Sequence, residues 1–157
     1  DLNTYYLSAL VLELASVSVD FEEQNPAIFL LTINTLKHIC YDGLPANLVV
    51  AKYAQDIMAY LGYKISFSKC SNCGMQYLGK VYLNLDSGAF VCSACKSANS
   101  LLISNQAFSL LKILNNTNYD RLGTIKISGS VAKEAITIIC KNLEQRLLKI
   151  IHSVKFI

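Results

Sequence analysis

Two pairs of cysteines lie in the middle of the chain, in the stretch CSNCGMQYLGKVYLNLDSGAFVCSAC at residues 70–95. The spacing is C-x2-C-x18-C-x2-C, and the ligand candidates are Cys70, Cys73, Cys92 and Cys95. This spacing is typical of a site with two zinc knuckles, in which each i, i+3 pair supplies two corners of a tetrahedron. Four thiolates leave no position open for water, so the sequence predicts a structural zinc ion (Zn2+) and not a catalytic one.

The residues between the two pairs predict a hairpin that folds the pairs together. Apolar residues alternate with polar or aromatic ones over residues 81–85, the turn sequence Asp86-Ser87-Gly88 follows, and a second strand covers residues 89–91. Gly74, directly after Cys73, lets backbone N–H groups approach the sulfurs. We therefore expect a zinc hairpin inserted at about residues 68–98.

Other roles for the four cysteines stay open on the residues alone. Disulfides would need a secreted protein, and the chain shows no secretion signal. A rubredoxin-like iron site uses the same ligands, but such sites usually carry Pro and Gly in the second knuckle, where this chain has Ser93-Ala94 and then Lys96. A thioredoxin-like redox pair would begin a helix after a strand, whereas these pairs flank a hairpin. Zinc is the favoured interpretation.

Three helices are predicted before the cysteines, because apolar residues recur there at helical spacing. Asn25 offers an N-cap for the second helix with Pro26 in its first position, and Pro45 starts the third, which runs to Gly62. The expected inward stripes are Leu7, Leu10, Val11 and Leu14 in the first, Phe29, Ile33, Leu36 and Cys40 in the second, and Val50, Tyr53, Ala54, Ile57 and Leu61 in the third.

Two further helices are predicted after the cysteines. Ser104 can cap the first of them, and the second runs from Ser130 as the longest helix of the chain, after a short extended piece at residues 124–127. Their expected inward stripes are Phe108, Leu111 and Leu114, then Ala132, Ile136, Ile139, Leu143, Leu147 and Ile150. The fold class is therefore mainly α: one helical bundle domain over residues 1–157 with a small inserted four-cysteine zinc hairpin.

The composition is apolar for a chain of 157 residues, with 53% hydrophobic and 16% charged residues and a mean hydropathy of +0.37. No run approaches the 18 or so apolar residues of a membrane span, so some apolar surface is expected to face a partner and no membrane is involved. The chain opens with Asp1 and has no basic residue before Lys37, unlike a signal peptide. We expect a cytoplasmic protein, or a piece of a longer one.

Charge is divided unevenly along the chain. Residues 1–60 carry seven acidic side chains against two lysines, and residues 61–157 carry twelve basic side chains against four acidic ones. The second part can therefore attract an acidic partner, although a bound zinc tetrathiolate would lower its charge by about two. The candidate phosphate contacts are Lys69, Lys80, Lys96, Lys141, Arg146 and Lys149. Solvated surface is the better interpretation for the lysines beside the knuckles.

Catalytic patterns are missing from the sequence: there is no Ser/His/Asp set, no Gly-rich phosphate loop and no pair of carboxylates in an activating context. We therefore expect a protein that is not an enzyme. Cys40 and Cys140 are expected to be buried hydrophobic residues, and His38 and His152 to lie at helix ends without a ligating role.

The order of these features resembles a known family. The run Tyr-Ala-Gln-Asp-Ile-Met-Ala-Tyr-Leu-Gly-Tyr at residues 53–63, followed by Cys70-Ser-Asn-Cys73-Gly74, resembles the bacterial recombination mediator RecO, in which a helix ending in Leu-Gly-Tyr leads into the first zinc knuckle. The hairpin before Cys92 and the ending Leu-Leu-Lys-Ile-Ile-His-Ser-Val-Lys-Phe-Ile at residues 147–157 are similar to that family as well. The resemblance runs from about Tyr5 to Ile157.

The resemblance implies a mediator of DNA repair and homologous recombination, nucleoid-associated in the bacterial cytoplasm. Implied activities are annealing of single-stranded DNA and support of RecA loading, and implied partners are RecR and the C-terminal tail of the single-stranded-DNA-binding protein. The family begins with an OB-fold domain, and no such strand pattern precedes the first helix here. With only Arg121 and Arg146, the sequence is also poor in arginine.

A receptor for the acidic tail, as the resemblance implies it, needs an apolar hole with cations at its rim. The stripes led by Phe108 and Leu111 and by Ile136 could leave a groove between their helices, with Lys112, Arg121 or Arg146 in reach of the terminal carboxylate. Core packing of both stripes is the alternative. For the whole chain, the rival function is a zinc-ribbon protein-interaction module without nucleic-acid contact.

Overall fold

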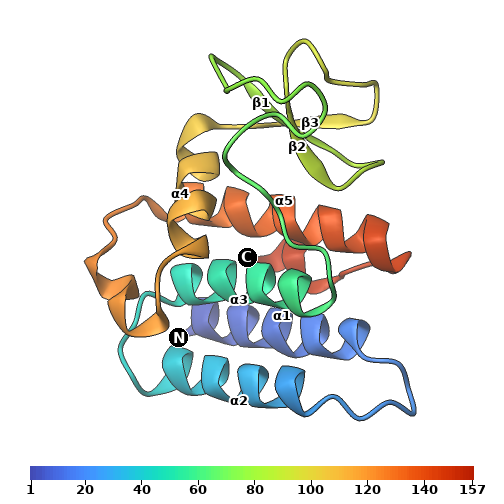
Figure 1. Ribbon diagram of the computed structural model, residues 1–157. Coiled ribbons are helices and arrows are strands. Elements are labelled where there is room, and N and C mark those ends of the chain that lie inside the picture. The colour runs from blue at the N-terminus through green and yellow to red at the C-terminus, as the bar shows by residue number, and fades with distance from the viewer.

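The computed structural model describes residues 1–157 as a helical bundle with a small antiparallel sheet at one side (Figure 1). The expected fold class is confirmed. No helix is long and apolar enough to cross a lipid bilayer. The elements in chain order are α1 (Leu2–Ser18), α2 (Pro26–Cys40), α3 (Ala46–Tyr60), β1 (Val81–Asn84), β2 (Ala89–Cys92), β3 (Ser100–Ile103), α4 (Asn105–Asn115), η1 (Tyr119–Thr124), α5 (Gly129–Leu147) and η2 (Ser153–Phe156).

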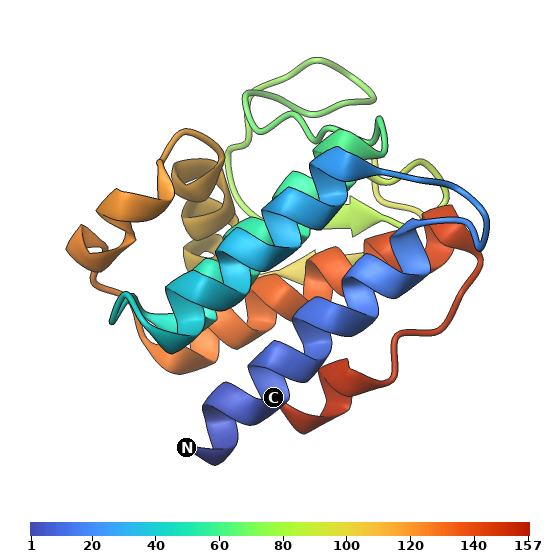
Figure 2. The same ribbon diagram turned by 90° about the horizontal axis from the view of Figure 1, so that it is seen from below.

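Helix α3 is the centre of the bundle. It packs against α1, α2, α4 and α5, and ten of its fifteen residues are buried. The view from below shows α1, α2 and α5 running beside it, with the C-terminal segment along α1 (Figure 2). The buried apolar residues of the helices, together with Val81, Leu83, Phe90 and Ile103 of the sheet, belong to one continuous core of 34 buried residues. A helix that is apolar on most of its faces is stable only inside such a core.

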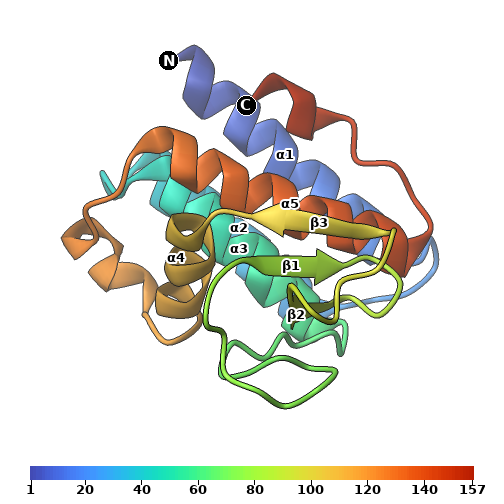
Figure 3. The same ribbon diagram turned by 90° about the horizontal axis from the view of Figure 1, so that it is seen from above.

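The sheet has the order β2-β1-β3, and both pairings are antiparallel. Val81 pairs with Cys92 across the hairpin and with Ile103 on the other side. From above, the sheet lies over α5 (Figure 3). The expected hairpin is confirmed, whereas β3 was not predicted from the sequence. The extended piece expected at residues 124–127 forms no strand.

Two helix starts show the side-chain capping that the sequence indicates. The Asn25 side chain accepts from Ile28 N at 3.1 Å, and the Ser104 hydroxyl accepts from Ala107 N at 3.1 Å. Helix α5 is capped by Ser128 rather than beginning at Ser130.

Helix α5 ends at Leu147 because Leu148 adopts a left-handed φ of 53°. The prediction that Ile150 lies on the inward stripe is therefore wrong, and Ile150 is 70% exposed.

The predicted inward stripe of α2 is wrong by one position. Phe29, Ile33 and Cys40 are exposed, while the buried residues of the helix are Ile28, Thr32, Thr35 and Ile39. Two threonines can line the core because their hydroxyls donate to carbonyls one turn back, Thr32 to Ile28 O and Thr35 to Leu31 O, each at 2.7 Å. The hydrophobic pattern does not show that a threonine hydroxyl can be satisfied within the helix, so it predicted the wrong inward face.

Candidate metal centre and its surroundings

The hairpin brings the four predicted cysteines together. Their sulfur atoms all lie within 4.8 Å of one another, and Cys73 Sγ is 3.9 Å from Cys92 Sγ. A tetrahedron with zinc–sulfur bonds of about 2.3 Å has edges of about 3.8 Å, so the cluster has the size of a four-cysteine metal site. Cys70 is buried and Cys73 is exposed. The four cysteines are positioned to bind one metal ion.

The protonation of the cluster also fits a cation. At Cys70, burial opposes the thiolate, but backbone N–H groups of Cys73, Cys92 and Asn72 outweigh it and lower the pKa to about 6. At Cys95, a hydrogen bond with Asn72 favours the thiolate, but desolvation and hydrogen bonds with the other cysteines raise the pKa to about 11. Four thiolates this close repel one another, so full ionisation calls for a positive charge among them.

Local backbone geometry shapes the first knuckle. Gly74 takes a φ of 75°, and its N–H donates to Cys70 O at 2.9 Å, so the chain turns tightly around the cysteine pair. Cys70 N donates to Met75 O at 2.9 Å, and Cys92 N donates to Cys70 Sγ at 3.3 Å. The second knuckle therefore contributes a hydrogen bond directly to a sulfur of the first.

Tyr77 is a positioning residue that the sequence did not reveal. Its hydroxyl lies 3.0 Å from both Lys69 O and Phe90 O and so ties the start of the first knuckle to β2. Burial raises the pKa of Tyr77 to about 12, with the nearby Cys70, Cys92 and Cys73 adding to the rise. Because the hydroxyl stays protonated, it remains a donor at any physiological pH.

An aromatic cluster joins the hairpin to the bundle. Phe108 of α4 packs edge-on against Tyr77 and Phe90, with centroid separations of 5.2 Å and 5.1 Å, and against Phe67 at 5.6 Å. The expectation of a partner groove at Phe108 and Leu111 is therefore wrong, because packed side chains fill this space. The other residues of the two stripes buried in the core are Leu114, Ile136, Ile139 and Leu143. The cationic side chains assigned to the rim of that groove, Lys112 and Arg121, are exposed.

Arg146 and Asn142 of α5 hold the hairpin turn. The Arg146 guanidinium donates to the carbonyls of Leu85 and Asp86, and the Asn142 amide donates to Gly88 O at 3.0 Å. A Cβ at Gly88, whose φ is 73°, would lie 3.0 Å from the Asn142 side chain. Arg146, a candidate phosphate contact, is thus engaged with the protein itself.

The other candidate phosphate contacts are spread over the surface. Lys69, Lys80 and Lys141 are exposed and form no ion pair, and Lys96 lies over the Tyr82 ring at 4.9 Å. Lys149 donates to Val17 O at 2.8 Å, at the C-terminal end of α1. The lysines of the hairpin and Lys141 are therefore exposed, whereas Lys149 and Arg146 donate hydrogen bonds to backbone carbonyls of the protein.

The remaining cysteines and histidines differ in burial and in the contacts they make. Cys140 is fully buried, as predicted, and burial raises its pKa. Cys40 is exposed, which makes the prediction of its burial wrong, because it follows the shifted face of α2. His38 lies 2.7 Å from Asp42 and stacks on Tyr119 at 5.1 Å, while His152 is exposed.

The comparisons with known proteins point in one direction. The family model described as "Recombination protein O C terminal" matches residues 1–155. The DNA repair protein RecO of Caldicellulosiruptor saccharolyticus is 26% identical over the whole chain, and that of Caldicellulosiruptor bescii is 24% identical. The RecO protein of Clostridium perfringens strain SM101 is also 24% identical, with 71% of its length covered.

The chain spans 65% of the length of the C. bescii protein and 64% of that of C. saccharolyticus. The match over residues 1–155 agrees with the resemblance carried by the knuckles and the Leu-Gly-Tyr helix end. The chain belongs to the RecO family of DNA repair and recombination proteins and corresponds to its C-terminal part.

Proposed function

We propose that this chain works as the C-terminal part of a DNA repair and recombination mediator that acts by binding and not by catalysis. Its ligand would be single-stranded DNA, and its protein partners RecR and the C-terminal tail of the single-stranded-DNA-binding protein. In the bacterial cytoplasm, at the nucleoid, it would support strand annealing and RecA loading. The observation that carries the proposal is the family match over residues 1–155.

Zinc is the metal we propose for the four cysteines. Four thiolates at tetrahedral separation suit Zn2+ and leave no site for a water ligand. Held in this way the ion would join two knuckles, and its chemistry would be structural. Elemental analysis of the purified chain should find about one zinc per chain, and iron in its place would contradict the proposal.

Single-stranded DNA is proposed as a ligand because basic residues dominate the second part of the chain, twelve against four acidic ones over residues 61–157. Contacts of lysine with phosphate release counterions and therefore weaken as salt rises. The proposed contacts with exposed side chains are Lys69, Lys80, Lys96 and Lys141. Arg146 and Lys149 could contribute only in addition to the hydrogen bonds that they already make.

A titration with a fluorescently labelled oligo(dT) tests this proposal. The logarithm of the association constant should fall linearly with the logarithm of the salt concentration. Lys141→Glu should weaken binding about equally for all base sequences and flatten the slope by about 0.7. Lys37→Glu, in the acidic first part, is the matched control and should change little. Absence of any salt-sensitive binding would contradict DNA contact and favour a protein-interaction module.

A further inference from the structure

An open groove of about 420 Å3 lies between the segment after α3 and the last turn of α4. Its walls are six polar residues over a small apolar floor. The lining consists of Lys64, Ser66, Ser68, Lys112, Asn115 and Asn116, with Ile65 and Phe67 as the apolar members. Such a lining offers hydroxyl and amide hydrogen-bond donors together with two ammonium groups.

The charge in the groove has one sign. Lys64 and Lys112 are exposed and form no ion pair, and the lining contains no Asp or Glu. These lysines come from two distant segments of the chain, which the fold brings to one groove. Two cations without a neighbouring carboxylate attract an anion.

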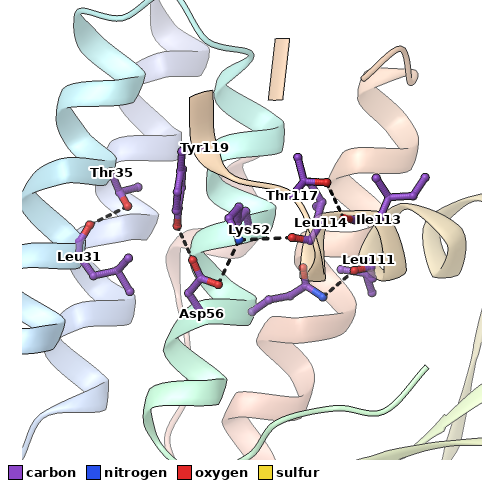
Figure 4. Close-up of polar contacts among 10 residues, drawn as sticks. Leu31, Thr35, Lys52, Asp56, Leu111, Ile113, Leu114, Thr117 and Tyr119 are labelled. Atoms are coloured by element: carbon purple, nitrogen blue, oxygen red, sulfur yellow. Dashed lines mark hydrogen bonds and ion pairs between the residues drawn. The ribbon is translucent and has the colours of Figure 1, made fainter. Parts of the chain in front are cut away.

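Helix α4 ends at this groove, and its carbonyl groups would ordinarily repel an anion there. The structure lessens this repulsion, because a side chain donates a hydrogen bond to each of the four carbonyls before Asn115. The donors are Gln55 to Leu111 O (3.0 Å), Asn116 to Lys112 O (3.4 Å), Thr117 to Ile113 O (2.7 Å) and Lys52 to Leu114 O (3.3 Å). Three of these bonds are visible in Figure 4.

Lys52 matters most among these donors because it is charged. The residue is only 8% exposed, and its ammonium lies 3.4 Å from Asp56 and 5.1 Å from the centroid of the Tyr119 ring. The Tyr119 hydroxyl in turn donates to Asp56 at 2.8 Å, so the three side chains form one network (Figure 4). This network fixes the Lys52 ammonium, with Asp56 as its counterion, where it donates to Leu114 O at the end of α4.

The inner end of the groove carries an unused acceptor. Gln55 is 8% exposed, and its Oε1 has no hydrogen-bond partner although its Nε2 is bonded to Leu111 O. Gln55 lines a narrow extension of about 10 Å3 that shares Lys64, Phe67 and Asn115 with the groove. This space fits one water molecule, which could bridge Gln55 to a ligand in the open part.

Two exposed tyrosines lie close in the chain to the lysine that lines the groove. Tyr60 and Tyr63 are 57% and 40% exposed, and Tyr63 immediately precedes Lys64 in the chain. Exposed aromatic rings beside a cationic groove are the combination that binds single strands, because any base can stack on a ring while the phosphates follow the cations. The polar lining suits a sugar-phosphate backbone better than an apolar peptide side chain.

We infer that the groove lined by Lys64 and Lys112 binds the phosphates of single-stranded DNA, with Tyr60 and Tyr63 as stacking surfaces. This inference rests on the proposed function and adds Lys64 and Lys112 to the DNA contacts proposed above. Each phosphate contact on a single strand contributes about 0.7 to the salt slope, so two contacts contribute about 25-fold in affinity at about 0.1 M salt.

The test uses the whole chain and labelled oligo(dT) at several salt concentrations. Lys64→Gln with Lys112→Gln should weaken binding about 25-fold at about 0.1 M salt and reduce the slope by about 1.4. Asn115→Asp, which keeps both lysines and adds a carboxylate, should also weaken binding. The control is Lys126→Gln with Lys155→Gln, which removes the same charge from exposed positions outside the groove. Thermal melting should show that all variants keep the fold.

The outcomes separate the groove from the proposed function. Oligo(dT) binding with unchanged affinity in the groove variants would overturn the groove and leave DNA binding by the chain intact. Equal losses of affinity in the groove and control variants would show that only net charge matters, and would also contradict the groove as the binding site. No binding by the unmodified chain would overturn both. If the groove variants lose a polyglutamate peptide and keep oligo(dT), the groove is a site for acidic peptides instead.

Discussion

The helical bundle and the hairpin at residues 68–98 are held together by different means. Ten of the fifteen residues of α3 are buried, whereas the buried residues of the hairpin region are only Cys70, Val81, Leu83, Phe90 and Val91. Apolar burial can support the bundle, but it is too small to order the hairpin alone. The hairpin therefore depends on three additions: the proposed metal, the aromatic cluster with Phe108, and the hydrogen bonds from α5.

Loss of the metal should separate the two regions most strongly. Structural zinc supplies about 10 kcal/mol or more in small peptides, so Cys92→Ser should abolish metal binding and disorder residues 68–98 while the bundle stays folded. Metal analysis and amide NMR spectra check this. Cys40→Ser is the matched control, since Cys40 is an exposed cysteine outside the cluster and should leave both regions unchanged.

A cavity in the bundle should destabilise the bundle and leave the metal site intact. Ile57 is fully buried in α3, so Ile57→Ala should lower the free energy of unfolding by about 2–5 kcal/mol. Below the unfolding transition the variant should keep its metal, because Ile57 lies in the bundle and outside the cysteine cluster. Urea denaturation followed by circular dichroism measures the first effect. Ile33→Ala, at a position 48% exposed on α2, should cost much less.

The hydrogen bonds between α5 and the hairpin turn can be removed without changing the metal site. Arg146→Leu removes the hydrogen bonds to Leu85 O and Asp86 O but keeps much of the side-chain bulk, and should cost about 1–3 kcal/mol. Amides of the turn at residues 85–88 should exchange faster, and metal content should not change. Lys141→Leu, at an exposed position earlier on α5, provides the comparison. Unaltered exchange at the turn would show that the Arg146 hydrogen bonds do not hold the hairpin turn.

Acidification should loosen one contact of the bundle, the one between α1 and the C-terminal segment. The Glu13 carboxylate accepts from His152 N at 2.7 Å and from Ser153 N at 2.6 Å. Burial opposes its ionisation, but the Ser153 side chain and these two N–H groups lower its pKa below the ordinary 4.5. A lowered pKa contributes stability that is present above the unfolded value and is lost as pH falls through the folded value.

NMR signals of η2 should therefore shift at acid pH, and Glu13→Gln should show the shifted state at neutral pH. The stacking of Tyr6 on Phe156, at 5.6 Å, supplies a second probe of the same contact. If η2 stays docked in Glu13→Gln, the carboxylate does not hold the C-terminal segment.

The regions also differ in how far the sequence predicted them. The cysteine spacing predicted the ligand cluster because metal geometry tolerates few alternatives, and the alternation and turn sequence over residues 81–91 predicted the hairpin. Periodicity predicted the helices and the inward faces of α1 and α3, where one face is uniformly apolar. It failed at α2, because Thr32 and Thr35 satisfy their hydroxyls within the helix, and at Ile150, because Leu148 ends α5 early.

Contacts between distant segments could not be predicted from local patterns. Arg146 and Lys149 looked like free cations but bond carbonyls 60 and 132 residues away in the chain. Phe108 looked like groove lining and instead packs on the hairpin. The groove at Lys64 and Lys112 likewise exists only after α4 returns to the end of α3.

The independence of the two regions is tested most directly by hydrogen exchange of the whole chain before and after zinc is removed with a chelator. The expected result is about one zinc per chain at the start and, after removal, loss of protection confined to residues 68–98, with the buried amides of α3 still protected. Simultaneous loss of protection in α3 would contradict a separately held hairpin, and unchanged protection of the hairpin would show that the metal does not hold it.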